Sequence, residues 1–484
     1  MDNRTRWFAL YVLCLGTLMI VLDVTIVNVA LPSIRGDLGF SGTSLAWVVN
    51  AYLLTYGGFL LLGGRLGDLF GHRRLFLIGL SLFTLASLAC GLATTQGFLI
   101  TARAIQGLGG AVVSAVSLSL IMNLFTEPAD RAKAMGIAGF VASGGGSIGV
   151  LLGGVLTDTL NWHWIFLVNV PIGALVYFLS LRLLPGTRAT ATDRRLDVAG
   201  AVTITASLML AVYAIVNGNH KGWTSGQTLG LLGAAAALLA VFLVVELRVR
   251  SPLIPLRLFR LRNVAFANVV GVLWAAAMFA WFFLSALYMQ LVLGYSPLQV
   301  GLGFLPSNLI MGALSIGVSA KLVMRFGIRR PLATGLLCAA GGLLLFARAP
   351  VGGTFVVDVL PSMILLGIGA GIAFNPVLLA AMSDVAPSES GLASGIVNTS
   401  FMMGGALGLA VLVSLAASRT HSLGAAGNGP LAALTGGYHA AFLVGAIFAL
   451  AAAAVGATLL RAGILGAAHA GEEAVGIPAA AEAD

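Results

Sequence analysis

Long apolar runs follow one another along nearly the whole chain, and they constrain its fold more than any other feature. A helix needs about 20 apolar residues to cross a hydrocarbon layer of about 30 Å. Fourteen runs meet this requirement, although the eleventh is short. We expect membrane-spanning helices at roughly 8–32, 44–64, 75–94, 97–124, 134–156, 164–184, 198–217, 228–247, 265–293, 298–323, 332–348, 359–382, 392–416 and 438–460.

The composition excludes a soluble fold. Charged residues make up only 9% of the 484 residues, whereas an ordinary soluble domain has roughly 25%. A soluble enzyme, a nucleic-acid-binding domain and a disordered scaffold are therefore excluded as the main part of the chain. Cys14, Cys90 and Cys338 all fall inside apolar runs, so we interpret them as buried apolar side chains rather than a disulfide or metal site. We expect no metal and no cofactor.

The basic residues indicate a topology. If the N-terminus is cytoplasmic, 21 of the 26 Lys and Arg residues fall in cytoplasmic segments, and only Arg35, Lys221, Arg348 and Arg419 fall in outer loops. Membrane proteins carry this excess on the cytoplasmic side. We predict a multi-pass protein of the inner (cytoplasmic) membrane with both termini in the cytoplasm. The net charge of +9 is then a topology signal and not a nucleic-acid surface.

A short internal repeat divides the chain. Residues 65–74 (RLGDLFGHRR) and 321–330 (KLVMRFGIRR) share a basic residue, Leu, Phe-Gly and Arg-Arg, and each copy follows the second span of a set of six. Paired six-span repeats are a transporter architecture. We predict an all-α membrane protein with spans arranged as 6 + 2 + 6: an N-terminal bundle (1–190), two inserted helices with a cytoplasmic loop (191–262), a C-terminal bundle (263–462) and a disordered cytoplasmic tail (463–484).

These motifs resemble those of a known family. The first copy of the repeat resembles the signature loop of the major facilitator superfamily. Residues 22–32 (LDVTIVNVALP) and 162–173 (WHWIFLVNVPIG) resemble motifs of its fourteen-span drug:proton antiporters, the EmrB/QacA type. The resemblance implies a gating role for the loop residues Gly64, Arg65, Gly67, Asp68, Gly71, Arg73 and Arg74. The alternative is a tight inner loop whose arginines only set the topology.

Two charged residues lie inside predicted spans. Asp23 is about 22 Å along the first span, at 1.5 Å per residue, and Arg103 lies in the outer part of the fourth. Intramembrane charges usually mark ion pathways or water-filled cavities. We hypothesise that Asp23 takes up a proton from outside and releases it inside, while Arg103 biases its proton affinity. A fixed ion pair between the two spans is the alternative. The resemblance adds that Arg103-x-x-Gln106-Gly107-x-Gly109 matches the family motif associated with proton coupling.

The fifth span resembles the antiporter motif of exporters. It carries Gly145, Gly149, Gly153 and Gly154, but Val150 stands where that motif has Pro. The usual proline kink is therefore not predicted, whereas a glycine face for close helix contact is.

The substrate cavity is expected between the two halves. Candidate lining residues on the spans that line such cavities in the superfamily are Asn28, Asn50, Gln106, Phe279, Trp281, Tyr288, Gln290, Asn308, Asn375, Asn398 and Met402. For Trp281 a place at the lipid interface is an equal alternative. The tenth span has no carboxylate, so Asp23 alone suits a neutral or monocationic amphipathic substrate.

We expect a proton-coupled exporter of amphipathic drugs or antibiotics that works by alternating access, as a monomer in the lipid bilayer. The Ala- and Gly-rich composition, with Arg far in excess of Lys, suggests a high-GC bacterium protecting itself from an antibiotic. A proton-coupled importer and a narrow-specificity metabolite exporter on the same fold are the alternatives. An intramembrane enzyme is not expected, because the His residues lie in loops, span ends or the tail.

Overall fold

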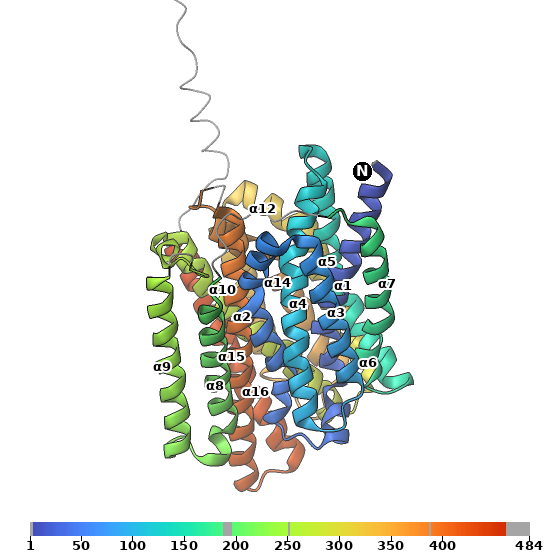
Figure 1. The fold of residues 1–484 in the computed structure, drawn as a ribbon. Coiled ribbons are helices and arrows are strands. Elements are labelled where there is room, and N and C mark those ends of the chain that lie inside the picture. The colour runs from blue at the N-terminus through green and yellow to red at the C-terminus, as the bar shows by residue number, and fades with distance from the viewer. Residues whose placement is uncertain (1–2, 187–195, 250–251, 387–388, 461–484) are drawn as a thin grey trace, which may run out of the picture.

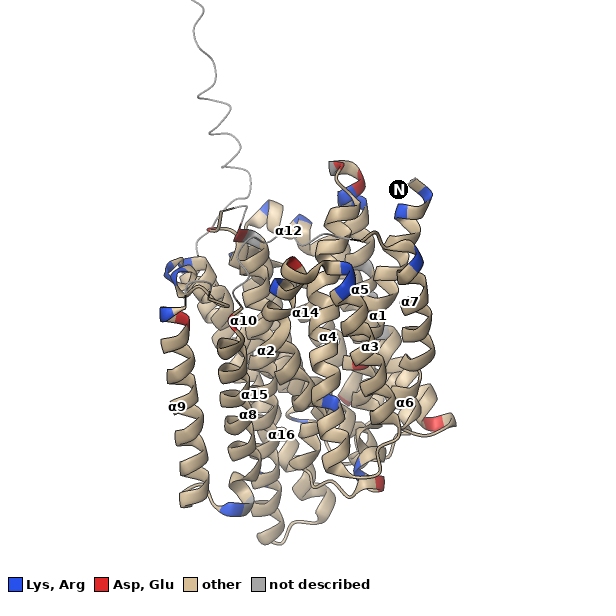
Figure 2. Cartoon of the chain, in the orientation of Figure 1, with Lys and Arg blue, Asp and Glu red and all other residues tan. Residues whose placement is uncertain are grey.

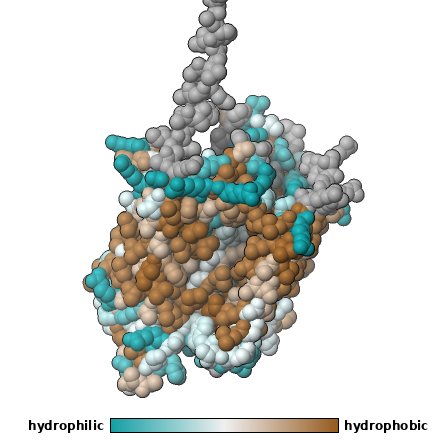
Figure 3. Space-filling view, turned by 90° about the vertical axis from the view of Figure 1, so that its left-hand side faces the viewer, coloured by the Kyte–Doolittle hydropathy of each residue, from teal (hydrophilic) through white to brown (hydrophobic). Residues whose placement is uncertain are grey.

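The computed structural model describes residues 3–186, 196–249, 252–386 and 389–460, and these residues form helices without any strand (Figure 1). Twelve of the helices are long and apolar enough to cross a membrane. Figure 3 shows a hydrophobic band between two more hydrophilic ends. Described residues therefore form an all-helical membrane bundle, as the apolar runs predict.

Apart from the short 3₁₀-helix η1 (Ser44–Ala46), the described residues of the N-terminal half form seven α-helices. They are α1 (Asn3–Leu38), α2 (Trp47–Phe70), α3 (His72–Gly91), α4 (Gln96–Leu124), α5 (Pro128–Thr159), α6 (Trp164–Leu167) and α7 (Asn169–Leu183). The predicted sixth span is thus interrupted between α6 and α7. Pro171 explains the break, because it has no N–H to donate to the carbonyl of Leu167.

Two helices connect the halves, and α-helices with three π-helical turns form the C-terminal half. The connecting helices are α8 (Val198–Lys221) and α9 (Gly226–Arg248), followed by the short helix η2 (Leu256–Arg260). The C-terminal half comprises α10 (Arg262–Leu287), η3 (Tyr288–Val292), α11 (Pro297–Ala313), η4 (Leu314–Val318), α12 (Ser319–Phe326), α13 (Arg329–Phe346), η5 (Phe355–Val359), α14 (Leu360–Met382), α15 (Ser390–Ala425) and α16 (Pro430–Leu459).

The count of fourteen membrane crossings stays a prediction. The predicted spans 134–156 and 332–348 lie in α5 and α13, which are helical but do not belong to the twelve apolar helices. Helix α13 is only 18 residues long and starts with two arginines, Arg329 and Arg330. Several side chains of α5 and the predicted tail 463–484 lie outside the described residues.

The sequence repeat corresponds to the same turn in both halves. Gly71 ends α2 with a φ of 90°, and Gly327 ends α12 with a φ of 72°. Only glycine adopts such angles readily, which explains why Phe-Gly recurs at both places. At each turn the next helix starts within two residues.

Contacts between the halves involve few helices. Helix α2 packs against α15, and α5 packs against α11, while α8 contacts both α2 and α15. Helix α9 packs mainly on α8 and lies at the edge of the bundle (Figure 1). Lys and Arg gather at the end of the bundle that carries the N-terminus (Figure 2); we call this end the N-terminal face.

Candidate functional site: a buried charge network beside a central cavity

Asp23 lies in the interior of the N-terminal half, with no exposed surface. Its Oδ2 is 2.5 Å from Nη1 of Arg103. Its Oδ1 accepts hydrogen bonds from Nε2 of Gln106 (2.6 Å) and from Nδ2 of Asn169 (3.1 Å). Because all three partners donate to it, the network accommodates the ionised carboxylate of Asp23.

Arg103 is held from several sides. Its Nε donates to the carbonyl oxygen of Val48 on α2 (2.9 Å), and its Nη1 also donates to Oε1 of Gln106 (2.6 Å). The guanidinium carbon lies 4.4 Å from the ring centroid of Tyr52, within cation–π distance. The structure therefore brings Asp23 and Arg103 together as an ion pair between α1 and α4, braced by α2.

A second layer of polar side chains orients Gln106. Ser87 on α3 accepts hydrogen bonds from Gln106 (2.5 Å) and from Asn169 (3.2 Å). Asn169 is the first residue of α7, directly after the break between α6 and α7. The Trp-rich motif thus contributes a side chain to the charge network. The sequence contained that signal, since Asn169 belongs to the motif, but polarity alone did not single it out.

A cavity of about 300 Å³ lies between the two halves. It is lined by residues of α1, α2, α5, α10, α11, η4, α14 and α15, and none of them is charged. Most of the wall is apolar or aromatic. The residues that line it are Ile20, Val21, Val24, Thr25, Asn28, Tyr56, Gly146, Trp274, Met278, Phe279, Phe282, Asn308, Met311, Ser315, Ala370, Phe374, Asn398, Phe401 and Met402.

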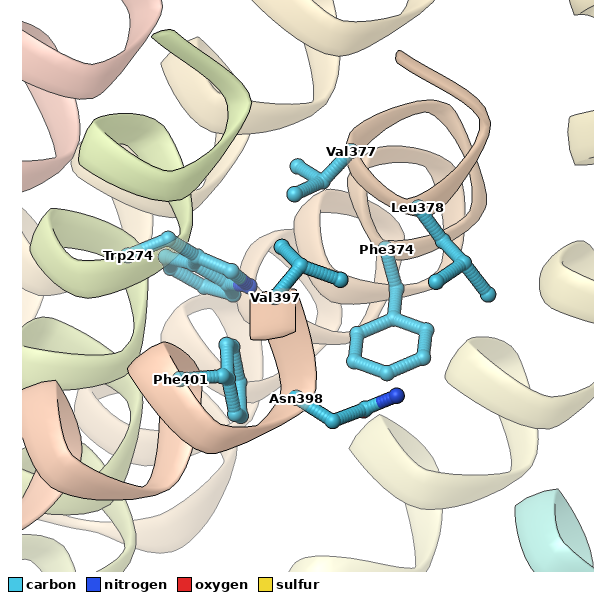
Figure 4. Close-up of a pocket in the computed structure, with 7 residues that line it drawn as sticks. All are labelled: Trp274, Phe374, Val377, Leu378, Val397, Asn398 and Phe401. Carbon is cyan, nitrogen blue, oxygen red and sulfur yellow. The ribbon is translucent and has the colours of Figure 1, made fainter. Parts of the chain in front are cut away.

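A small pocket of about 20 Å³ adjoins this cavity between α10, α14 and α15. Trp274, Phe374 and Phe401 belong to both linings, and Figure 4 shows their rings around the pocket together with Asn398. The C-terminal half thus supplies most of the aromatic surface, whereas the N-terminal half supplies the charge network.

The network borders the cavity without opening into it. Asp23 does not line the cavity, but the next residues of α1, Val24 and Thr25, do. On the other side, the ring of Tyr52 stacks on that of Tyr56 with centroids 5.7 Å apart, and Tyr56 lines the cavity. A change at Asp23 or Arg103 can therefore reach the cavity wall through α1 and through the two tyrosines.

Only some of the predicted cavity residues line this cavity. Asn28, Asn308, Asn398, Phe279 and Met402 do. Gln106 belongs to the charge network, and the others are engaged or buried elsewhere. Asn50 is buried in α2, and Trp281 is 1% exposed inside the C-terminal half rather than at the lipid interface. The other three form hydrogen bonds: Tyr288 donates to the Pro350 carbonyl, Gln290 donates to the Val29 carbonyl, and Asn375 donates to Ser315.

The cavity residues that the sequence did not single out are Tyr56, Trp274, Phe282, Phe374 and Phe401, among others. They are apolar or aromatic residues within apolar helices. In such a helix the same residue types face lipid, neighbouring helices or a cavity, so no sequence pattern distinguishes them.

The two halves touch each other at the end of the cavity away from the N-terminal face. A Cβ on Gly154 of α5 would lie 2.7 Å from the Pro297 carbonyl oxygen at the start of α11, so the backbones touch there. Gln290 adds its hydrogen bond to Val29 of α1 (2.8 Å). On the side of the N-terminal face, by contrast, η4 has no buried residue.

The glycine residues of α5 allow close contact with two neighbouring helices, α1 and α11. Cβ atoms on Gly145, Gly149 and Gly153 would collide with α1, whereas Gly154 faces α11. Val150, which stands where the antiporter motif has Pro, is fully buried. Glycine at these positions lets α5 approach α1 and α11 at the same time.

The predicted gating loop forms the turn between α2 and α3. Asp68 lies 3.2 Å from Nε2 of His72, and Arg73 donates to the Leu181 carbonyl of α7 (2.5 Å). A Cβ on Gly67 would contact Val116 of α4 at 2.8 Å, while Gly64 has open space and Arg65 and Arg74 are exposed. The loop therefore ties α2, α3 and α7 together, and its gating role stays a prediction.

Within the described residues no group of three or more His, Cys, Asp or Glu side chains is arranged to hold a metal ion.

A helical membrane bundle with a central cavity between two halves is the architecture of a membrane transporter. The model of the Major Facilitator Superfamily matches residues 13–409 of this chain, so the chain belongs to that superfamily.

Curated relatives are named for antibiotic export or resistance. The chain is 42% identical to the cephamycin export protein CmcT of Amycolatopsis lactamdurans (93% of this chain, 92% of the relative). It is 40% identical to the puromycin resistance protein pur8 of Streptomyces alboniger (91% and 89%). Among solved structures, the fold is similar to an inward-facing bacterial homologue of the lysosomal transporter Spinster (TM-score 0.67, 16% identity, 94% and 97% covered). It is also similar to the inward-open conformation of the xylose transporter XylE from E. coli, with a TM-score of 0.65 and 15% sequence identity. This match covers 97% of this chain and 99% of XylE.

Proposed function

We propose that this protein exports amphipathic compounds, neutral or monocationic, in exchange for protons by alternating access. The observation that carries the proposal is the buried Asp23–Arg103 pair beside an apolar cavity without charged lining residues. The names of the relatives, which refer to export of and resistance to antibiotics, support efflux of an antibiotic as the biological task.

The proton step follows from the charge balance of the pair. Protonation of Asp23 in the present arrangement leaves the guanidinium of Arg103 buried without a counter-charge, which is strongly unfavourable. Proton uptake therefore accompanies a movement that separates or hydrates the pair. Return of Arg103 to the carboxylate then expels the proton. The proton is the only coupling ion in this scheme, and no cofactor is required.

The orientation is part of the proposal. The basic residues gathered at the N-terminal face support a cytoplasmic location of that face and of both termini in the inner membrane. With this orientation the contacts between α5 and α11 and between Gln290 and α1 lie on the outer side of the cavity. We further propose fourteen crossings arranged as 6 + 2 + 6, and a monomer as the transporting unit.

The substrate class follows from the cavity. Its aromatic and apolar wall excludes ions of high charge because it offers them no counter-charge, while the amides of Asn28, Asn308 and Asn398 can bind the polar part of an amphiphile. Its volume of about 300 Å³ is at the lower end for drug-sized ligands.

Accumulation of a fluorescent lipophilic cation in efflux-deficient bacteria tests the proposal, with puromycin and a cephamycin as further substrates. Cells that produce the protein are expected to accumulate less of at least one compound, a protonophore should restore accumulation, and Asp23→Asn should abolish efflux. The matched control is Asp158→Asn, which removes an exposed carboxylate at the end of α5 and should leave efflux unchanged.

Efflux by Asp23→Asn that a protonophore still suppresses would contradict the coupling role and favour a fixed ion pair. Efflux of a single antibiotic would identify a narrow-specificity exporter. Proton-driven uptake in place of efflux would identify an importer.

A further inference from the structure

Two buried carboxyl groups lie outside the charge network, where the connecting helices begin and end. Asp197 directly precedes α8 and is 5% exposed, and Glu246 lies in the last turn of α9 and is 4% exposed. Helices α8 and α9 pack together as an antiparallel pair. The start of α8 and the end of α9 therefore meet near the N-terminal face (Figure 1).

Each carboxyl group has one oxygen bound to backbone. Oδ1 of Asp197 accepts from the N–H of Gly200 (2.7 Å) and caps α8. Oε2 of Glu246 accepts from the N–H of Ile254 (3.2 Å) and anchors the segment that leads to α10. These bonds orient the two side chains and leave one oxygen of each group for another partner.

The two side chains lie close together, and each keeps one oxygen without a donor. Oδ2 of Asp197 and Oε1 of Glu246 are buried and receive no hydrogen bond from an N–H or O–H group of the described residues, and the two side chains lie within hydrogen-bonding reach of one another. Ionised carboxylates only accept hydrogen bonds. A hydrogen bond between the two groups therefore requires a proton on one of them.

No ion pair joins either carboxyl group to a Lys, Arg or His side chain among the described residues. Leu196, which precedes Asp197, and Ile254, which donates to Glu246, both pack on an apolar cluster formed by Leu62 of α2, Ala201 of α8 and Leu253. Two ionised carboxylates in such a place would repel each other strongly.

We propose that Asp197 and Glu246 share a single proton and form a second proton-binding site, separate from Asp23. The proton fastens the start of α8 to the end of α9. Helix α8 contacts α2 of one half and α15 of the other. The pair is therefore a proton-dependent link between the two helices that connect the halves. Loss of the proton leaves two negative charges side by side and weakens the contact between the start of α8 and the end of α9.

The sign of the pH effect follows from linkage. In the unfolded chain both carboxyl groups release their protons at about pH 4. At neutral pH the folded protein therefore binds one proton more than the unfolded chain. The stability that the pair contributes is fully present below about pH 4 and falls as the pH rises from there, until the folded pair has ionised.

Infrared spectra and thermal unfolding of the purified full-length protein test this proposal without any transport assay. Wild-type protein at neutral pH should show the C=O band of a protonated carboxyl group that Glu246→Gln removes. In this variant the amide N–H₂ donates to Oδ2 of Asp197 in place of the shared proton. The midpoint of thermal unfolding should then fall less toward alkaline pH than in the wild type.

Glu389→Gln is the matched control, because Glu389 belongs to the surface ion pair with Arg257. It should keep the wild-type band and the wild-type pH dependence. The proposal is overturned if Glu246→Gln leaves both the band and the pH dependence unchanged. It is also overturned if sodium, but not choline, stabilises the wild type at alkaline pH and Glu246→Gln abolishes that effect, since the pair would then bind a cation.

Discussion

Arg103 is one of the largest fully buried side chains among the described residues, and Asp23 is its counter-charge. Removal of one partner of a buried ion pair typically costs about 3–5 kcal/mol, because the other charge remains in a medium of low polarity. The stability of the N-terminal half and the proposed proton coupling therefore depend on the same two atoms, Oδ2 of Asp23 and Nη1 of Arg103.

Removing both charges should restore stability without restoring function. We expect Asp23→Asn to lower the free energy of unfolding by about 3–5 kcal/mol, and Asp23→Asn with Arg103→Gln to recover most of this loss. Proton-coupled efflux should be absent from both variants. Thermal unfolding in detergent and the dye assay measure the two effects separately. Equal stability of the single and double variants would argue against a strong pair.

Asn308 offers a second test at the scale of single residues. It lines the cavity, is 1% exposed, and neither of its amide atoms has a hydrogen-bond partner among the described residues. A buried polar group without a partner costs about 1–3 kcal/mol.

Asn308→Leu should therefore raise the thermal stability, yet weaken export of substrates that can hydrogen-bond in the cavity. Asn268→Leu serves as the comparison, because Asn268 is buried in α10 away from the cavity. Unfolding midpoints and dose–response curves for two cargoes of different polarity measure both effects. Unchanged export of every cargo would remove Asn308 from the binding site.

For single residues, the sequence indicates the members of the charge network better than the residues that line the cavity. Asp23 and Arg103 stand out because charged residues in an apolar run are rare. Their shared partner Gln106 stands in the sequence both as a cavity candidate and in the motif that includes Arg103, and the structure places it in the charge network. Trp274 and Phe401 gave no signal, because an apolar side chain on a membrane helix has several equivalent places to face.

Helix α5 shows how spacing along an element determines its contacts. A Cβ on Gly149 would lie 2.0 Å from Oγ1 of Thr25 and 3.1 Å from the Leu22 carbonyl oxygen. On Gly146, three residues earlier, the nearest atom would be 3.8 Å away, which is an ordinary contact. The two glycines therefore differ in what an added methyl group displaces.

Gly149→Ala should force α5 away from α1 and reduce efflux at least about tenfold, which corresponds to about 1.4 kcal/mol. Gly146→Ala should be tolerated, apart from a slight narrowing of the cavity. Initial rates of dye efflux at matched protein levels decide between these outcomes. Comparable rates for the two alanine variants would show that α5 does not need its close contact with α1.

The existence of the long helices follows from sequence, whereas their interruptions do not. Apolar runs of sufficient length predict a helix in lipid, because backbone groups must be bonded internally there. Pro171 accounts for the break before Asn169, yet Pro32, Pro306 and Pro376 lie inside continuous helices. A proline in an apolar run therefore does not by itself predict an interruption, and the π-helical turn Tyr288–Val292 contains no proline.

The topology of the whole molecule is testable at the loop between α8 and α9. Lys221 at the end of α8 is exposed and should face the outside if both connecting helices cross the membrane. In Lys221→Cys, a membrane-impermeant maleimide should label intact cells. Glu127→Cys, between α4 and α5, should react only after the cells are lysed. Labelling of neither variant in intact cells would contradict the arrangement with two inserted crossings.

Helix α9 has few neighbours other than α8, and only 17% of its most apolar stretch is buried. In a membrane its remaining surface is in contact with acyl chains, and a mismatch between helix length and bilayer thickness costs a fraction of a kcal/mol per Å. Ser207 of α8 holds the carbonyl of Ala235 in α9 (2.7 Å), and α8 in turn contacts both halves. In the proposed alternating-access cycle, a change in the thickness of the surrounding lipid would therefore change the free energy needed to separate the two halves.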